Sequence, residues 1–182
     1  MKSILENRII VTSGTLILVS IFLFIEHLKG GVVTHHLLAR EDLPGISNWW
    51  GLLTVSLLAW SVATLIQHRK RKAGPSEQKH VNDANKVLYR FLAALAFGIA
   101  ASVLWELKLE SVLQYFILLP ILISFFKPVH LPEYLLGFVL GMMYSFGGIL
   151  PIIVGLVLLM ISFLIHSVIR ILKRVMVSKG NK

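Results

Sequence analysis

The sequence predicts an all-α integral membrane protein, a compact bundle of six transmembrane helices with a short interfacial helix in the first outer loop. Apolar residues make up 56% of the 182-residue chain and charged residues only 15%, against roughly 25% in globular domains. The charges are also clustered, and they leave uncharged stretches between them. These stretches match the roughly 20 apolar residues that a helix needs to cross the hydrocarbon core of a bilayer.

We expect residues 1–182 to form one membrane domain. The first apolar run follows Lys2 and Arg8 as in a signal peptide, but no small-residue cleavage site closes it, so we interpret it as a retained helix. Pro120 is expected to kink the fourth span. The spans are predicted at about residues 9–25, 46–66, 87–105, 111–126, 133–147 and 150–170, with a hydrophilic cytoplasmic linker at 67–86.

The last apolar stretch decides the number of helices. Residues 134–169 contain no Asp, Glu, Lys or Arg, and one helix of that length would measure roughly 54 Å, against a hydrocarbon core of roughly 30 Å. The Gly147–Gly148 pair and Pro151 supply a break near the middle, so we expect a hairpin of two spans. We expect this hairpin to pack closely through the small-residue pair Gly137 and Gly141. The third span carries a similar face of small residues, Ala94, Gly98 and Ser102.

The basic residues predict the orientation. Of the 18 Lys and Arg residues, only Lys29, Arg40 and Lys108 fall outside when the N-terminus is placed in the cytoplasm, which leaves 15 inside. The tryptophans Trp49, Trp50 and Trp105 then fall at outer helix ends, where an aromatic belt is expected. We therefore expect a multi-pass protein of the cell (inner) membrane with cytoplasmic N- and C-termini. Its partners are expected to be membrane lipids and a membrane protein, and the net charge of +9 reflects orientation rather than nucleic-acid binding.

Polar residues that could carry chemistry gather at the predicted outer face. Imidazole and carboxylate groups together suit zinc or another divalent metal, and they also suit proton transfer near neutral pH. The candidate metal ligands are His27, His35, Glu26 and Asp42. The complete candidate site comprises Glu26, His27, His35, His36, Arg40, Asp42, Asn48 and Glu106. The alternative is a polar connector without a site, because a short outer loop needs polar residues to meet water.

The first outer loop also predicts local structure. Val33 with Leu37, and Thr34 with Leu38, have the i, i+4 spacing of a short amphipathic helix in the membrane interface. Ser47 is a predicted N-cap of the second span.

Two classes of function remain open from the sequence. The first is a non-catalytic module, permease-like or acting in assembly or sensing, with a polar His/acid site at the outer face. The second is a membrane-embedded metal- or His-dependent enzyme that acts on a lipid headgroup. No dense ligand motif is present, which counts against the enzyme. We expect almost no ionisable residue inside the spans, which counts against ion-coupled transport.

Overall fold

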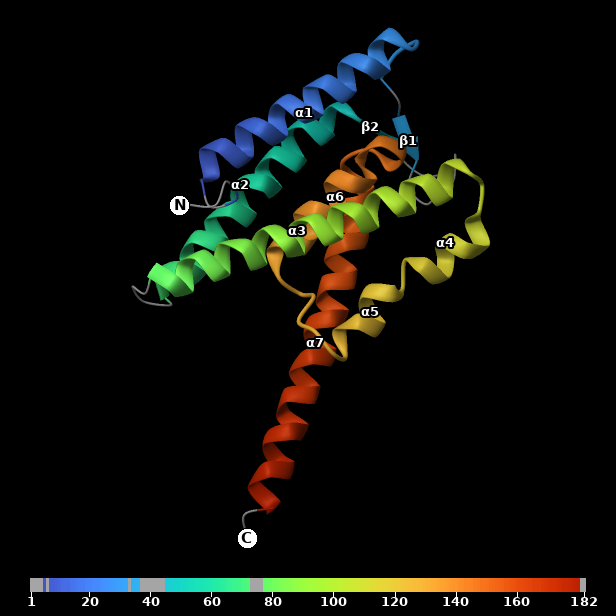
Figure 1. Cartoon of the computed structure of the whole chain (residues 1–182). Coiled ribbons are helices and arrows are strands. Elements are labelled where there is room, and N and C mark those ends of the chain that lie inside the picture. The colour runs from blue at the N-terminus through green and yellow to red at the C-terminus, as the bar shows by residue number, and fades with distance from the viewer. Residues whose placement is uncertain (1–4, 6, 33, 37–44, 73–76, 181–182) are drawn as a thin grey trace.

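The computed structural model describes residues 5, 7–32, 34–36, 45–72 and 77–180 of the chain, and its fold is helical apart from one pair of short strands (Figure 1). The elements in chain order are α1 (Arg8–Leu28), β1 (Thr34–His36), β2 (Gly45–Ser47), α2 (Trp49–Lys72), α3 (Glu77–Glu106), α4 (Glu110–Phe116), α5 (Leu119–Ser124), α6 (Pro132–Phe146) and α7 (Ile149–Gly180).

Within the described residues, four helices are long and apolar enough to cross a membrane: α1, α2, the 84–106 part of α3 and the 149–172 part of α7. Their outward faces are apolar, and Ile17 and Met160, for example, are 59% and 64% exposed. Such exposed apolar faces would be costly in water and are stable against lipid. The prediction of a helical protein with several helices of membrane length is therefore confirmed for four of the six predicted spans.

The two remaining predicted spans have a different form. The fourth is divided into two short helices: α4 ends at Phe116, and α5 begins at Leu119 with Pro120 in its first turn. This is the interruption expected of proline. The fifth is α6, which has 15 residues and would extend only about 22 Å.

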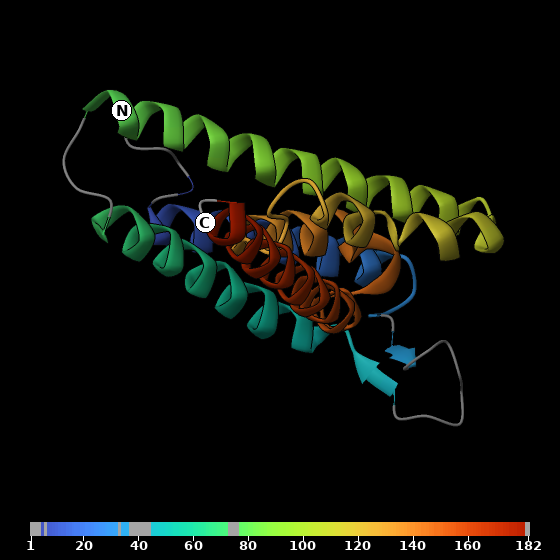
Figure 2. The same cartoon turned by 90° about the horizontal axis from the view of Figure 1, so that it is seen from below.

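Helix α6 forms the centre of the fold and buries nine of its 15 residues. It contacts α2, α3 and α7, and its interface with α3 is the most extensive between any two described elements. In Figure 1 α3 crosses in front of α6, while Figure 2, seen from below, shows α7 in front of the other helices. Leu136, Val139 and Phe138 of α6 join three different apolar clusters, so this one helix connects the core.

The close approach of α3 and α6 depends on glycine. A Cβ atom at Gly141 would lie 2.5 Å from the carbonyl oxygen of Leu95, and one at Gly98 would lie 2.6 Å from that of Phe138. Ser102 Oγ donates a hydrogen bond of 3.1 Å to the Gly141 carbonyl oxygen across the same interface. The prediction of close packing through Gly137 and Gly141 is confirmed, but the partner we expected was wrong: the glycines face α3 rather than α7.

Two predictions about polar segments are corrected. Residues 67–72 and 77–86, expected to belong to a linker, continue α2 and begin α3, because Lys, Arg, Gln and Glu favour helix as well as water. The interfacial helix is wrong over Thr34–His36, which pair as an antiparallel strand with Gly45–Ser47. Backbone hydrogen bonds between the strands β1 and β2 take the place of the helical hydrogen bonds that we expected. Residues 37–44 of that prediction lie outside the described residues.

The turn between α6 and α7 is the break expected at the glycine pair. Gly147 caps α6 with a φ of +69°, a conformation that glycine adopts without a steric penalty, and its N–H donates to the Met143 carbonyl oxygen. α7 begins at Ile149, and Figure 1 shows its C-terminal part projecting away from the other helices.

Candidate functional site

Part of the predicted outer-face set converges on one asparagine. Asn48 precedes α2 and is only 7% exposed. Its Nδ2 donates to Glu26 Oε1 at 2.7 Å, and its Oδ1 accepts from the backbone N–H of Gly148 at 3.1 Å. One amide therefore links the end of α1, the start of α2 and the turn before α7. Since both polar ends of the amide are used within the fold, we interpret this contact as a structural link between helices.

The other described members of the set lie apart from this link. Glu106 Oε1 accepts a hydrogen bond from Ser145 Oγ at 3.0 Å, which joins the ends of α3 and α6. His27 is exposed in the last turn of α1. Ser47, the predicted N-cap, lies in β2, and Asn48 is the residue that directly precedes α2.

The remaining members of the set stay predictions. The side chains of His35 and His36 lie outside the described part of the structure, as do Arg40 and Asp42 entirely. Among the side chains that are described, no three His, Asp or Glu residues lie close enough together to hold a metal ion. A metal or proton site at the outer face therefore depends on residues 35–42.

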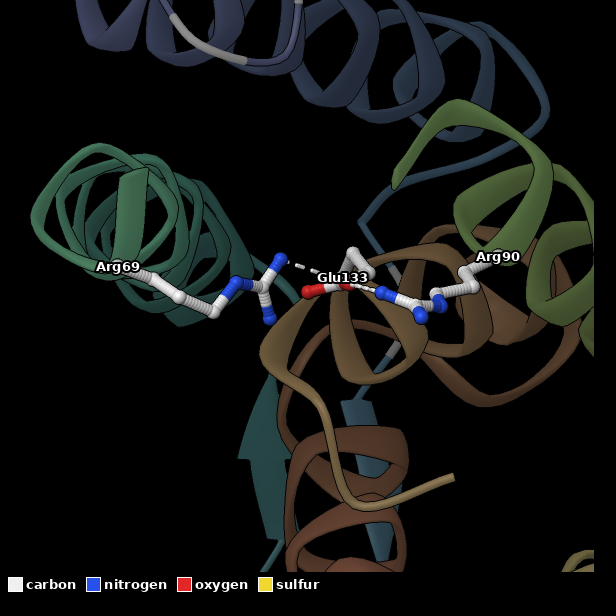
Figure 3. Close-up of polar contacts among 3 residues, drawn as sticks. All are labelled: Arg69, Arg90 and Glu133. Atoms are coloured by element: carbon white, nitrogen blue, oxygen red, sulfur yellow. Dashed lines mark hydrogen bonds and ion pairs between the residues drawn. The ribbon is translucent and has the colours of Figure 1, made fainter. Parts of the chain in front are cut away.

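A buried charge cluster lies at the opposite ends of the same helices. Glu133, in the first turn of α6, is completely buried. Its Oε1 accepts from Arg69 Nη2 at 3.0 Å and from Arg90 Nη1 at 3.1 Å (Figure 3). Arg69 lies near the end of α2 and Arg90 in α3, so the carboxylate joins three helices. We refer to Arg69, Glu133 and Arg90 as the arginine–glutamate triad.

Local sequence explains the position of Glu133. Leu131 has an extended backbone, and Pro132 takes the first position of α6, where its missing N–H costs nothing. The carboxylate then lies at the helix N-terminus, where the unpaired N–H groups favour a negative charge. Its second oxygen, Oε2, is buried without a hydrogen-bond partner among the described residues. Burial of such a group is costly unless it is paired, so the two guanidinium groups stabilise it.

The triad was missed in the sequence, where we expected almost no ionisable residue inside the spans. That expectation was wrong for Glu133, which opens the predicted span at 133–147. One feature of the sequence could have identified it: Glu133 is the only acidic residue after Glu110. A single carboxylate in a long apolar region has to find a cation from another helix, and ionisable residues at such positions are often functional.

A cavity of about 280 Å³ lies close to the triad, between α3, α5, α6 and α7. Most of its wall is apolar and includes Ala93, Phe97, Phe138 and Leu158. Its volume lies just below the range typical of ligand sites, about 300–1,000 Å³.

Polar groups also line this cavity. Tyr89, Lys127 and Tyr134 belong to its lining, and the exposure of Tyr89 (71%) and of Lys127 shows that the cavity reaches the surface beside these two residues. Tyr134 follows Glu133 in the chain and also interacts with the guanidinium of Arg90. The arginine–glutamate triad is therefore connected to the cavity through Tyr134. No acidic residue is found among the described residues that line the cavity.

A pair of histidines lies between the α5–α6 segment and α7. The rings of His130 and His166 have centroids 5.2 Å apart, and Phe163 contacts His130 edge-on at 5.4 Å. Burial is the main cause that lowers the pKa of His130, and the nearby His166 and Arg170 lower it further. The neutral form of this imidazole is therefore favoured, and its Nδ1 is buried without a hydrogen-bond partner among the described residues.

Comparison with known proteins completes the description of the site. The chain matches no protein-family model, no curated protein and no solved structure.

Proposed function

We propose that the protein is a six-pass protein of the cell (inner) membrane with its N- and C-termini in the cytoplasm. The 15-to-3 distribution of basic residues supports the orientation. Contacts between helix ends support the path of the chain: Glu133 at the start of α6 lies beside Arg69 and Arg90, whereas Gly148 after α6 lies beside Asn48. Helix α6 thus runs between the two ends of the bundle. In this proposal two crossings are short: α4 and α5 together form one, and α6 forms the other.

Within this topology, we propose a non-catalytic, permease-like or sensing module that binds one alkyl chain of a membrane amphiphile. The observation that carries the proposal is the apolar cavity of about 280 Å³ between α3, α5, α6 and α7. Lipid surrounds a protein of this kind, and an apolar cavity with a polar end matches an amphiphile in shape and polarity. The proposal involves no chemical reaction, so the polar groups that line the cavity serve to recognise the amphiphile. The outer-face His/acid site remains a separate prediction.

Filling the cavity tests the proposal. Ala93 and Ala96 are both exposed on α3, but only Ala93 belongs to the cavity lining. Native mass spectrometry of the detergent-purified protein would measure retention of a single-chain probe, lysophosphatidylglycerol. We expect Ala93→Trp to abolish retention and Ala96→Trp, the matched control, to leave it unchanged. Equal retention by both variants, or no retention by the unmodified protein, would show that the cavity does not bind an alkyl chain.

The topology has its own test, made simple by the absence of cysteine from the chain. Single cysteines at Ser76 and Thr34 would be exposed to an impermeant thiol reagent on intact cells. We expect labelling at Thr34 and none at Ser76 until the cells are permeabilised. The reverse pattern would invert the proposed orientation.

A further inference from the structure

We infer that the amphiphile carries an anionic headgroup and that Lys127 binds this headgroup at the polar end of the cavity. The inference rests on the proposed function, because it specifies the ligand of the same cavity. It follows from three observations: the pairing of Lys127, the balance of charge around the cavity, and the position of its opening.

The ammonium group of Lys127 has no partner among the side chains that the structure describes. It follows α5 and lines the cavity, and its side chain is exposed. No hydrogen bond or ion pair joins its ammonium group to any described residue. An ammonium group that borders an apolar cavity and has no internal counterion is available to a ligand. A ligand phosphate placed there would gain a charge-assisted hydrogen bond.

The described residues that line the cavity with Lys127 include no acidic residue. Glu133, which precedes the lining residue Tyr134, already pairs with both Arg69 and Arg90. Two guanidinium groups on one carboxylate leave an excess of one positive charge. Glu133 thus neutralises one of the two arginine charges and does not neutralise the charge of Lys127. A cavity whose described lining contains a cation and no carboxylate therefore favours an anion over a zwitterion.

The opening of the cavity suits a headgroup. Tyr89 and Tyr134 lie on the lining together with Lys127, and their hydroxyl groups can donate hydrogen bonds to phosphate oxygens. The apolar wall formed by Phe97, Phe138 and Leu158 lies beyond them and would take the chain. Under the proposed orientation this opening is at the cytoplasmic side, where anionic lipids concentrate. The ligand class is therefore an anionic phospholipid with one chain inserted.

The test compares two probes that differ only in the headgroup, which is anionic in one and zwitterionic in the other. Lysophosphatidylglycerol and lysophosphatidylcholine with the same acyl chain would be titrated against the purified full-length protein by native mass spectrometry. We expect a preference of about fivefold for the anionic probe, as for one basic residue at an anionic membrane surface. Lys127→Gln should abolish the preference, and Lys127→Arg should retain it. The matched control is Lys108→Gln, a change at an exposed lysine in the turn between α3 and α4 that should alter nothing.

The outcomes separate this inference from the proposed function. Equal binding of the two probes, still abolished by Ala93→Trp, would overturn the headgroup inference and leave the cavity proposal intact. A preference that persists in Lys127→Gln would show that Lys127 is not the headgroup ligand. Failure of the protein to bind either probe would overturn both proposals. Displacement of lysophosphatidylglycerol by millimolar inorganic phosphate would identify free phosphate, rather than a lipid, as the ligand.

Discussion

The two ends of the helical bundle handle polar groups in different ways. At the end that contains Asn48, one buried amide connects the helices: its Nδ2 donates to Glu26 and its Oδ1 accepts from the N–H of Gly148. At the other end, a completely buried carboxylate is held by two arginines from two other helices. Water can replace a lost partner at the first end, because Glu26 and Glu106 are only partly buried or exposed. Water has little access to Glu133.

This difference indicates where function is expected. A link that water can partly replace is typical of a structural contact at a surface. A buried charge is retained at a cost, because desolvation of the ions offsets much of their mutual attraction. The end of the bundle with the triad also contains the cavity and Lys127, whose ammonium group has no partner among the described residues. The other end contains the turn between α6 and α7. The comparison can be tested by substitutions at each end.

The largest effect is expected from Glu133→Gln. This change leaves two guanidinium groups together without a counterion, and we expect a loss of about 3–5 kcal/mol in the free energy of unfolding. Thermal unfolding in detergent would measure it. The matched control at the opposite end is Glu106→Gln, for which we expect a change within about 0.5 kcal/mol because Glu106 is exposed. Equal effects of the two substitutions would remove the distinction between the ends.

The second effect concerns the interface that joins the two ends. Replacing Gly137 and Gly141 together with Leu should separate α6 from α3, because Cβ atoms at both positions collide with the backbone of α3. We expect a loss of about 1–3 kcal/mol for each site. Gly14, where a Cβ meets no other atom within 4 Å, is the matched control for a Leu substitution. An unchanged melting temperature in the double variant would contradict the close α3–α6 packing.

A smaller effect is expected from Asn48→Ala. The change removes a donor to Glu26 and leaves the N–H of Gly148 unpaired, so we expect a loss of about 1–3 kcal/mol. Asn48→Asp would keep the acceptor for Gly148 but place a carboxylate beside Glu26, so it should also destabilise the fold. Recovery in the double variant Asn48→Asp with Glu26→Gln would confirm the link. If Asn48→Ala unfolds at the wild-type temperature, the link contributes nothing to stability.

The smallest effect is a dependence on pH at His130. Its folded-state pKa lies below the unfolded value of 6.5, first because of burial and then because of His166 and Arg170. Above pH 6.5 the imidazole is neutral in both states and contributes no pH dependence. Below pH 6.5 the unfolded state binds the proton more readily, so stability falls until the pH passes the folded-state pKa. One proton limits the slope to about 1.4 kcal/mol per pH unit. His130→Gln should flatten this slope in thermal unfolding measured from pH 7 to pH 4.5. A slope that is unchanged in the variant would assign the effect to other groups.

Several features of the fold were determined by the sequence alone, because they depend on local composition. Uncharged stretches of membrane length predicted the helices, and the Gly147–Gly148 pair predicted the break between α6 and α7. Pro120 predicted the interruption between α4 and α5, since its ring and missing N–H act within one turn of helix. The small-residue faces of α3 and α6 were also visible as spacing along the chain. Each of these effects is independent of the distant parts of the chain.

Only the tertiary structure decided which faces and charges meet. The pairing of Gly141 with Gly98, rather than with α7, depends on the position of α6 at the centre of the fold, which spacing within one helix does not specify. The triad depends on three helices bringing Arg69, Arg90 and Glu133 together across 64 and 43 residues of chain. The distribution of basic residues along the chain predicts that both arginines lie on the cytoplasmic side, but the attraction that buries Glu133 acts through space. The cavity and the unpaired Lys127 at its opening result from the same packing.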